Sequence, residues 1–237
     1  MAEILTFLPG TMCDQRLWGP VWQRLIPRFS CDYVPTETEQ TREGMLGLIH
    51  SVASVGKPID LVAFSMGGYL ALEYALANPG RVASLVTVAS SAFGLTDKEK
   101  ADRIRSLPLL ETHDYRGMPP ARLNQFVHFS HRSDPAVVDV IRAMDRELGK
   151  PVLMAQLKET STRASLAPRL SELDIPVLLI GVALYFALKK GLDDRDRHER
   201  LSARAFGLAF VLSSPTTAQP ARGGDVVMLR CAFAGAE

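Results

Sequence analysis

The chain contains the stretch Leu61-Val62-Ala63-Phe64-Ser65-Met66-Gly67-Gly68-Tyr69. Its first half belongs to the apolar run Ile59 to Phe64, which has the length and composition of a parallel strand covered on both faces. Its second half begins a helical pattern that continues to Ala77. A serine on a sharp turn between a strand and a helix presents its hydroxyl to a cleft, and small residues two positions before and after it let the two elements cross closely. We therefore predict that Ser65 is a nucleophile, with a helix N-cap as the alternative role.

Further strand patterns flank this turn along the chain. Glu3 to Leu8, Val82 to Ala89 and Pro176 to Gly181 are short, mostly apolar runs. The first ends in the turn Leu8-Pro9-Gly10-Thr11-Met12-Cys13-Asp14, which precedes a helical pattern through Leu25. Strands that alternate with helices in this way predict an α/β fold with a mostly parallel sheet.

With these motifs the chain resembles the α/β-hydrolase superfamily, and within it the small single-domain serine hydrolases with a helical cap. The resemblance rests on the LPG turn that begins at Leu8, the CD..LW stretch after it, and FSMGGY around Ser65. It implies an α/β-hydrolase fold, with a mostly parallel central sheet flanked by helices and an inserted helical cap. It also implies an oxyanion hole formed by the backbone N–H groups of Met66 and of either Thr11 or Met12, each of which contributes about 3 kcal/mol.

Residues 96–170 are more polar than the rest, and prolines interrupt their helical pattern. One helix is well marked, because Ser133-Asp134 fits its cap, Pro135 fits its first turn and Gly149 follows its end. We interpret 96–170 as the cap, and residues 1–95 with 171–237 as the hydrolase core. The three histidines in the cap are expected to face solvent or a neighbouring carboxylate and not to catalyse. They are His113, His128 and His131.

The resemblance fades after about Gly181, and the carboxyl-terminal part is atypical. Relatives place an acid in a turn soon after this strand and a histidine on a later loop, as a nucleophilic serine requires. The candidate acid here is Asp194, with Asp193 in reserve, and the candidate general base is His198, the last histidine of the chain. The charged run from Asp193 to Arg200 is also typical of a solvated helix end. We hypothesise that the segment after Gly181 is not the family's usual carboxyl end and arises from a shifted reading frame or a replacement.

Composition excludes several classes of protein. A net charge of +1, 22% charged residues and 47% hydrophobic residues are typical of a soluble globular protein and give no reason to expect nucleic acid as a partner. The cysteines are three and widely spaced, and no phosphate-binding loop appears, so we expect no metal and no cofactor. No secretory pattern and no apolar run of the ~20 residues that span a bilayer are present, which predicts a cytoplasmic protein without a membrane partner.

The sequence thus predicts a serine hydrolase that cleaves a small ester, thioester or amide through an acyl-enzyme on Ser65. Its expected partner is a small-molecule acyl substrate. Two alternatives remain open: a non-catalytic binding protein that has lost its base, and an inactive product with an incomplete sheet. The acyl group, the leaving group, the acyl acceptor and the oligomeric state are not specified by the sequence.

Overall fold

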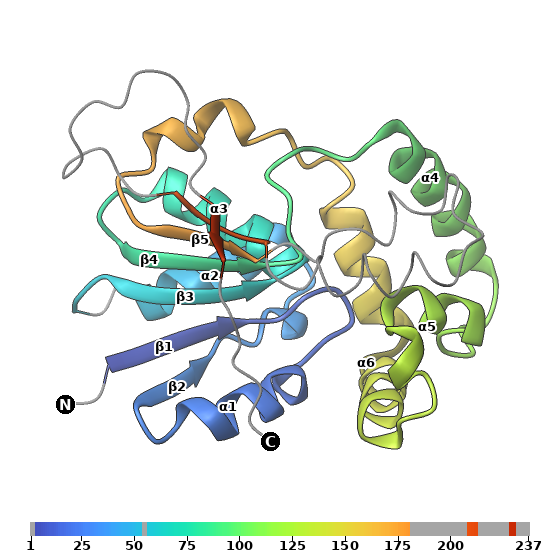
Figure 1. Ribbon diagram of the computed structural model, residues 1–237. Coiled ribbons are helices and arrows are strands. Elements are labelled where there is room, and N and C mark those ends of the chain that lie inside the picture. The colour runs from blue at the N-terminus through green and yellow to red at the C-terminus, as the bar shows by residue number, and fades with distance from the viewer. Residues whose placement is uncertain (1–2, 54–55, 181–207, 213–227, 231–237) are drawn as a thin grey trace.

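The computed structural model describes residues 3–53, 56–180, 208–212 and 228–230 of the 237-residue chain. At its centre lies a seven-stranded sheet in the order β2-β1-β3-β4-β5-β6-β7 (Figure 1). The strands are β1 (Glu3–Leu8), β2 (Phe29–Tyr33), β3 (Ile59–Phe64), β4 (Val82–Val88), β5 (Val177–Ile180), β6 (Leu208–Leu212) and β7 (Met228–Arg230). Strands β1 to β5 are parallel, whereas β6 pairs antiparallel with β5 and β7 antiparallel with β6. The predicted mostly parallel sheet is confirmed.

Helices lie along the sheet and beyond one of its ends. They are α1 (Gly19–Leu25), α2 (Arg42–Ala53), α3 (Met66–Ala77), α4 (Asp97–Thr112), α5 (Pro120–Phe126) and α6 (Pro135–Glu159). The short 3₁₀ helices in the described part of the chain are η1 (Gln15–Trp18), η2 (Thr36–Thr38), η3 (Phe129–His131) and η4 (Ala167–Glu172). Helix α3 contacts β1, β3 and β4, and α2 contacts α3. The predicted helix from Met66 to Ala77 coincides with α3.

The core lies where α3 meets the central strands. Helix α3 is apolar almost all round, and ten of its twelve residues are buried. A helix with this composition must be covered on every side, which places it between the sheet and its neighbouring helices. On β3, Leu61 and Ala63 point to the same face of the sheet and are almost fully buried. Asp60, Val62 and Phe64 point to the other face and are half-buried, so the described residues cover one face of this strand more closely than the other. The elements that carry Ser65 are therefore firmly held.

Backbone strain gathers at the carboxyl ends of the central strands. Among the described residues, three that are not glycine have positive φ: Met12 (55°), Ser65 (50°) and Ala89 (49°). Met12 comes shortly after the end of β1, Ser65 directly after β3, and Ala89 directly after β4. This conformation costs about 1–2 kcal/mol for a residue with a Cβ atom and persists only where the surroundings enforce it. Strain of this kind collects at functional sites, and the carboxyl edge of a parallel sheet is where such folds bind ligands.

Helices α4, α5 and α6 lie beyond that carboxyl edge and follow β4 in the chain (Figure 1). The helix predicted from Pro135 begins there, with the Asp134 side chain accepting a hydrogen bond from Ala136 N. Gly149 has φ 66° and ends its first half, as predicted, but a second helical half continues to Glu159 after this kink. Pro151 starts that second half without cost, because the first turn of a helix needs no N–H from it.

Candidate active site

Ser65 occupies a sharp turn between β3 and α3, which we call the elbow. Its backbone has φ 50° and ψ −113°, and its hydroxyl does not cap α3. The turn is fixed by main-chain contacts, because Ser65 N donates to Val88 O at 2.8 Å and Ser65 O accepts from the Ser90 hydroxyl at 2.8 Å. The backbone is therefore held in a strained shape while the side-chain oxygen stays unused by the helix. This geometry is typical of a nucleophile and not of an N-cap.

Glycines allow the turn and the loop after β1 to approach closely. A Cβ atom on Gly67 would lie 2.3 Å from Pro9 O, and one on Gly10 would lie 3.1 Å from Ser65 Cβ. Because the contact at Gly67 is with backbone, a side chain there would displace the loop. We call residues 9–14 the β1 loop. The structure brings the β1 loop against Ser65, as the predicted oxyanion hole requires.

The two candidate N–H donors of the β1 loop differ in whether they already have a hydrogen-bond acceptor. Met12 N donates to Gln156 Oε1 at 2.8 Å in a buried hydrogen bond, so this N–H is already occupied. Neither Thr11 N nor Met66 N has a hydrogen-bond acceptor within the described part of the chain. Thr11 is therefore the better candidate of the pair, with Met66 as its partner. Sequence patterns missed Gln156, because no local signal connects residues so far apart in the chain.

The predicted acid and base cannot be placed beside Ser65. Asp194, its reserve Asp193 and His198 all lie outside the described residues. The three histidines of the helical segment make local contacts: His113 with Thr112, His128 with Ser130, and His131 with Asp134. All three are exposed, and His131 faces the Asp134 carboxylate, as expected. Their role stays a prediction.

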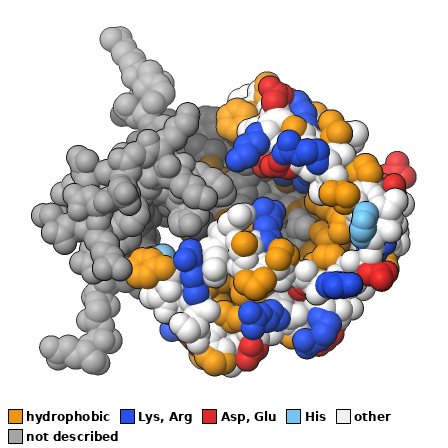
Figure 2. All heavy atoms as spheres, turned by 90° about the vertical axis from the view of Figure 1, so that its right-hand side faces the viewer, with side chains coloured by type: hydrophobic (Ala, Val, Ile, Leu, Met, Phe, Trp, Pro, Cys, Tyr) orange, Lys and Arg blue, Asp and Glu red, His pale blue; other side chains and the backbone are white. Residues whose placement is uncertain are grey.

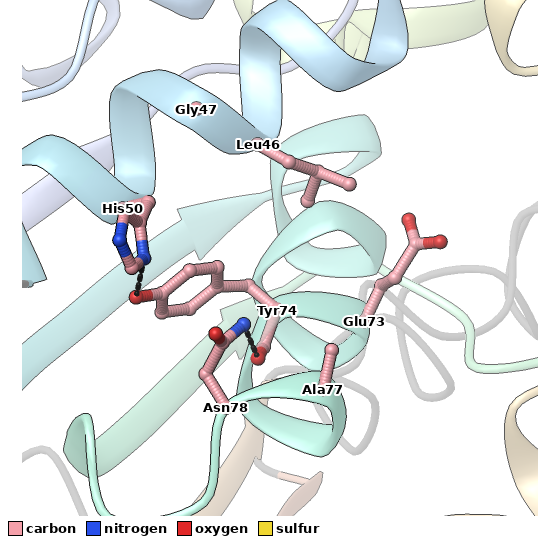
Figure 3. A pocket seen from close by; sticks show the side chains of 7 residues that line it. All are labelled: Leu46, Gly47, His50, Glu73, Tyr74, Ala77 and Asn78. Carbon is pink, nitrogen blue, oxygen red and sulfur yellow. Dashed lines mark hydrogen bonds between the residues drawn. The ribbon is translucent and has the colours of Figure 1, made fainter.

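His50 lies on α2, and its Nδ1 is 3.2 Å from the hydroxyl of Tyr74, near the carboxyl end of α3. Tyr74 is roughly 13 Å along the helix axis from Ser65, at about 1.5 Å per residue. His50, Tyr74 and Asn78 line a pocket of about 330 Å³ between α2 and α3 (Figure 3). This pocket is separate from the elbow, and His50 is not positioned to accept a proton from Ser65.

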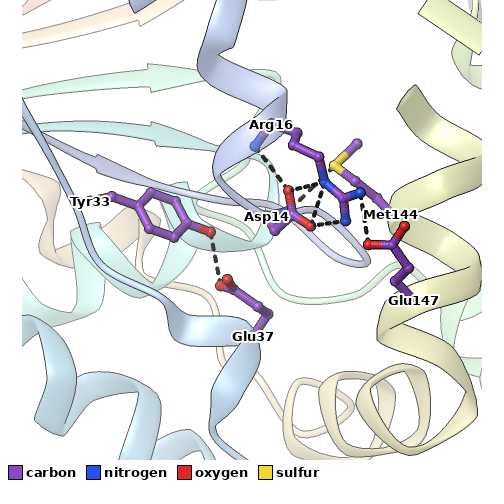
Figure 4. Close-up of polar contacts among 6 residues, drawn as sticks. All are labelled: Asp14, Arg16, Tyr33, Glu37, Met144 and Glu147. Carbon is purple, nitrogen blue, oxygen red and sulfur yellow. Dashed lines mark hydrogen bonds and ion pairs between the residues drawn. The ribbon is translucent and has the colours of Figure 1, made fainter. Parts of the chain in front are cut away.

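Ionisable groups in and next to the β1 loop have shifted pKa values, and Figure 4 shows the contacts of Asp14 with Arg16 and of Tyr33 with Glu37. Burial raises the pKa of the Cys13 thiol to about 12, so the thiol stays protonated at neutral pH and is no rival nucleophile. Burial opposes ionisation of Asp14, but its hydrogen bonds to Arg16 outweigh this and lower the pKa of the carboxyl. Burial also raises the pKa of Glu37, which accepts a hydrogen bond from the Tyr33 hydroxyl at 2.9 Å.

The face formed by the helices beyond the sheet is partly apolar. Figure 2 shows this face with a hollow bordered by hydrophobic side chains. Large hydrophobic residues exposed on or near these helices are Phe93, Ile104, Leu109, Phe126 and Phe129.

Within the described residues, no group of His, Cys, Asp and Glu side chains is arranged to hold a metal ion. None of the helices in the described part of the chain is both long enough and hydrophobic enough to cross a membrane.

Comparisons with known proteins agree with this arrangement. Pimeloyl-[acyl-carrier protein] methyl ester esterase of Neisseria meningitidis serogroup B is 26% identical over 132 residues, which cover 54% of this chain and 51% of that protein. The same enzyme of serogroup A matches at 26% over 132 residues, covering 54% of this chain and 42% of that protein. The chain thus spans about half the length of the curated relatives it matches. These relatives are esterases by name.

Solved structures share the fold at low identity. An esterase from Thermogutta terrifontis has a TM-score of 0.61 at 20% identity, covering 76% of this chain and 71% of that one. The enol-lactonase of Burkholderia xenovorans LB400 has a TM-score of 0.61 at 15% identity, covering 76% and 73%. A profile of the alpha/beta hydrolase fold matches residues 53–184, more than half of the 237 residues. Together with the elbow and the parallel sheet, this match shows that the chain belongs to the alpha/beta hydrolase fold family.

Proposed function

We propose that this chain is a serine hydrolase that cleaves a small ester, thioester or amide through an acyl-enzyme on Ser65. One observation carries the proposal: Ser65 is held at φ 50° at the end of β3, with Gly10 of the β1 loop packed against it. The esterases among the relatives support an ester as the first substrate class to test.

In the proposed reaction, Ser65 Oγ attacks the carbonyl carbon and the carbonyl oxygen becomes an oxyanion. The N–H groups of Thr11 and Met66 donate to that oxyanion, each contributing about 3 kcal/mol to lowering the barrier. The leaving group departs with a proton, and water then hydrolyses the acyl-enzyme. Because both amides belong to a rigid backbone, they need little rearrangement as charge develops.

We assign the proton transfers to His198, with Asp194 as the acid that orients it. Both residues lie outside the described part of the chain, so only their order in the sequence supports this step. They occupy positions in one charged run, whereas relatives bring the acid and the base from separate loops. The non-catalytic alternative therefore stays as an outcome of the test below.

We propose that residues 96–170 form a cap over the hydrolase core of 1–95 and 171–237. The position of α4, α5 and α6 beyond the carboxyl edge of the sheet supports this division (Figure 1). The exposed apolar side chains near these helices would suit an uncharged acyl chain (Figure 2). A small-molecule acyl compound is accordingly the proposed substrate.

A fluorophosphonate probe tests the proposal on the full chain. We expect the probe to label Ser65, as identified by peptide mass spectrometry, and Ser65→Ala to lower labelling by at least about 10³-fold. Ser91→Ala is the matched control, because Ser91 is an exposed serine near the elbow and is expected to leave labelling unchanged. Absence of labelling in cooperatively folded protein would instead favour the non-catalytic binding protein. Aggregated or protease-sensitive material would favour the inactive product.

A further inference from the structure

The hydrogen bond between Met12 and Gln156 joins two distant parts of the chain beside the elbow. Met12 N donates to Gln156 Oε1 at 2.8 Å, and the Gln156 side chain is fully buried. This contact fixes the orientation of the Gln156 side-chain amide, because a backbone N–H can donate only to the amide oxygen and not to its nitrogen. Gln156 belongs to the second half of α6, beyond the kink at Gly149.

The residue that receives this contact has an unusual backbone conformation. Its φ of 55° lies in the left-handed region, which a methionine adopts only under constraint. Met12 directly follows Thr11, the candidate oxyanion donor, and the Met12 N–H belongs to the peptide that joins the two residues. A hydrogen bond at this N–H therefore restrains the backbone on the carboxyl side of Thr11. Because its acceptor Gln156 lies on α6, this hydrogen bond ties the turn to that helix.

We propose that Gln156 is a positioning residue for the oxyanion hole. Its side-chain oxygen, acting through Met12 N–H, holds the β1 loop in the strained turn that aims Thr11 N–H at the reacting carbonyl. The inference rests on the proposed function of Ser65, because an oxyanion hole has a role only where an acyl group is attacked. Gln156 itself does not touch the substrate.

Further contacts between α6 and the β1 loop support this role. Asp14 N donates to Met144 Sδ at 3.4 Å, and Arg16, just after the loop, pairs with Glu147 at 2.8 Å (Figure 4). Met144 and Glu147 precede the kink in α6, whereas Gln156 follows it. The bend at Gly149 thus lets both halves of one helix contact the same short segment.

The backbone around Gln156 is itself anchored. The Thr160 hydroxyl donates to Gln156 O at 2.6 Å, and Arg103 Nη1 donates to the Thr160 hydroxyl at 2.8 Å. Gln156 Nε2, in contrast, is buried without a partner in the described structure. An unpaired buried donor is costly. The oxygen is therefore the one polar atom of this side chain that has a described partner.

The test compares Gln156→Met with the double variant Gln156→Met/Met12→Gly. Methionine keeps the length of the side chain but removes the acceptor, and glycine adopts positive φ without strain. We expect Gln156→Met to lower the second-order rate of fluorophosphonate labelling by tenfold or more, mostly through the bond-forming step and not through probe affinity. Met12→Gly in that background is expected to restore the rate at least threefold. Gln125→Met, an exposed position on α5, is the matched control and is expected to label at the wild-type rate.

A purely structural role gives a different result. Gln156→Met would then lower the melting temperature while the labelling rate of the folded fraction stays within twofold of wild type, and this outcome would overturn the inference. Hydrogen exchange of the Met12 amide, followed by NMR, supplies a readout that does not need activity. We expect protection in wild type and its loss in Gln156→Met, and equal exchange in both proteins would also overturn the inference. If wild type fails to label while protection follows this expectation, the proposed hydrolase function fails and the contact between Gln156 and the loop stands.

Discussion

The two ends of α3 differ in how the chain enters and leaves the helix. At the amino end, Ser65 is strained, its hydroxyl does not cap the helix, and a Cβ atom on Gly67 would meet backbone at 2.3 Å. At the carboxyl end, Asn78 N and Asn78 Nδ2 both donate to Tyr74 O at 2.9 Å. Gly80 supplies a positive φ of 78° there, with open space around it.

The difference separates two reasons for an unusual backbone. At the carboxyl end, the residue types that end helices most easily, asparagine and glycine, take the positions that need them. At the amino end, a serine occupies a conformation that glycine would adopt at lower cost. This contrast supports the proposal that Ser65 is kept for its hydroxyl, and it does so without reference to any relative.

Gly67→Ala is the change with the largest expected effect. The added Cβ atom meets Pro9 O, which cannot rotate away, so the β1 loop must shift. We expect a stability loss of about 1–3 kcal/mol in denaturant unfolding and at least a tenfold slower labelling of Ser65. Gly47→Ala in α2 is the control, because nothing lies within 4 Å of its added Cβ atom. A Gly67→Ala protein that labels at the wild-type rate would contradict the close packing of loop and elbow.

Gly80→Ala is the corresponding change at the other end of α3. Alanine has room there but must adopt a φ of 78°, so we expect a stability loss of about 1 kcal/mol. Labelling of Ser65 should remain within twofold of wild type, measured well below the midpoint of unfolding. Slower labelling without further unfolding would show that the two ends are coupled.

His50→Gln should have the smallest effect. Glutamine keeps a polar contact to the Tyr74 hydroxyl, and His50 lies far from Ser65 along α3. We expect an unchanged pH profile of labelling and a change in stability of at most about 0.5 kcal/mol. Loss of labelling in this variant would identify His50 as the base and reverse the distinction between the two ends.

The sequence predicts the elements around Ser65 well, because their signals are local. The strand Ile59–Phe64, the helix Met66–Ala77 and the first strand Glu3–Leu8 appear in the structure with those bounds. Strand β2 was not predicted, since its residues Phe29–Tyr33 alternate between half-buried and exposed and include serine and aspartate. Helix α2 was also not predicted, although Met45, Ile49 and Ala53 form a buried helical stripe.

The candidate site was predictable only in part. Ser65 and Met66 lie in one short motif, and the choice between Thr11 and Met12 needed a contact with Gln156 that only the folded chain makes. Spacing in the sequence cannot reveal such a contact between a loop and a distant helix. Asp194 and His198 stay predictions, because they lie outside the described residues. The family match ends at residue 184, close to Gly181, where the resemblance fades.

The most direct test of the oxyanion hole at Ser65 is a crystal structure of the full chain after reaction with a small fluorophosphonate. We predict a phosphorus atom bonded to Ser65 Oγ and a phosphoryl oxygen about 2.7–3.1 Å from both Thr11 N and Met66 N. A phosphoryl oxygen directed away from these two amides, or modification of another residue in place of Ser65, would contradict the account.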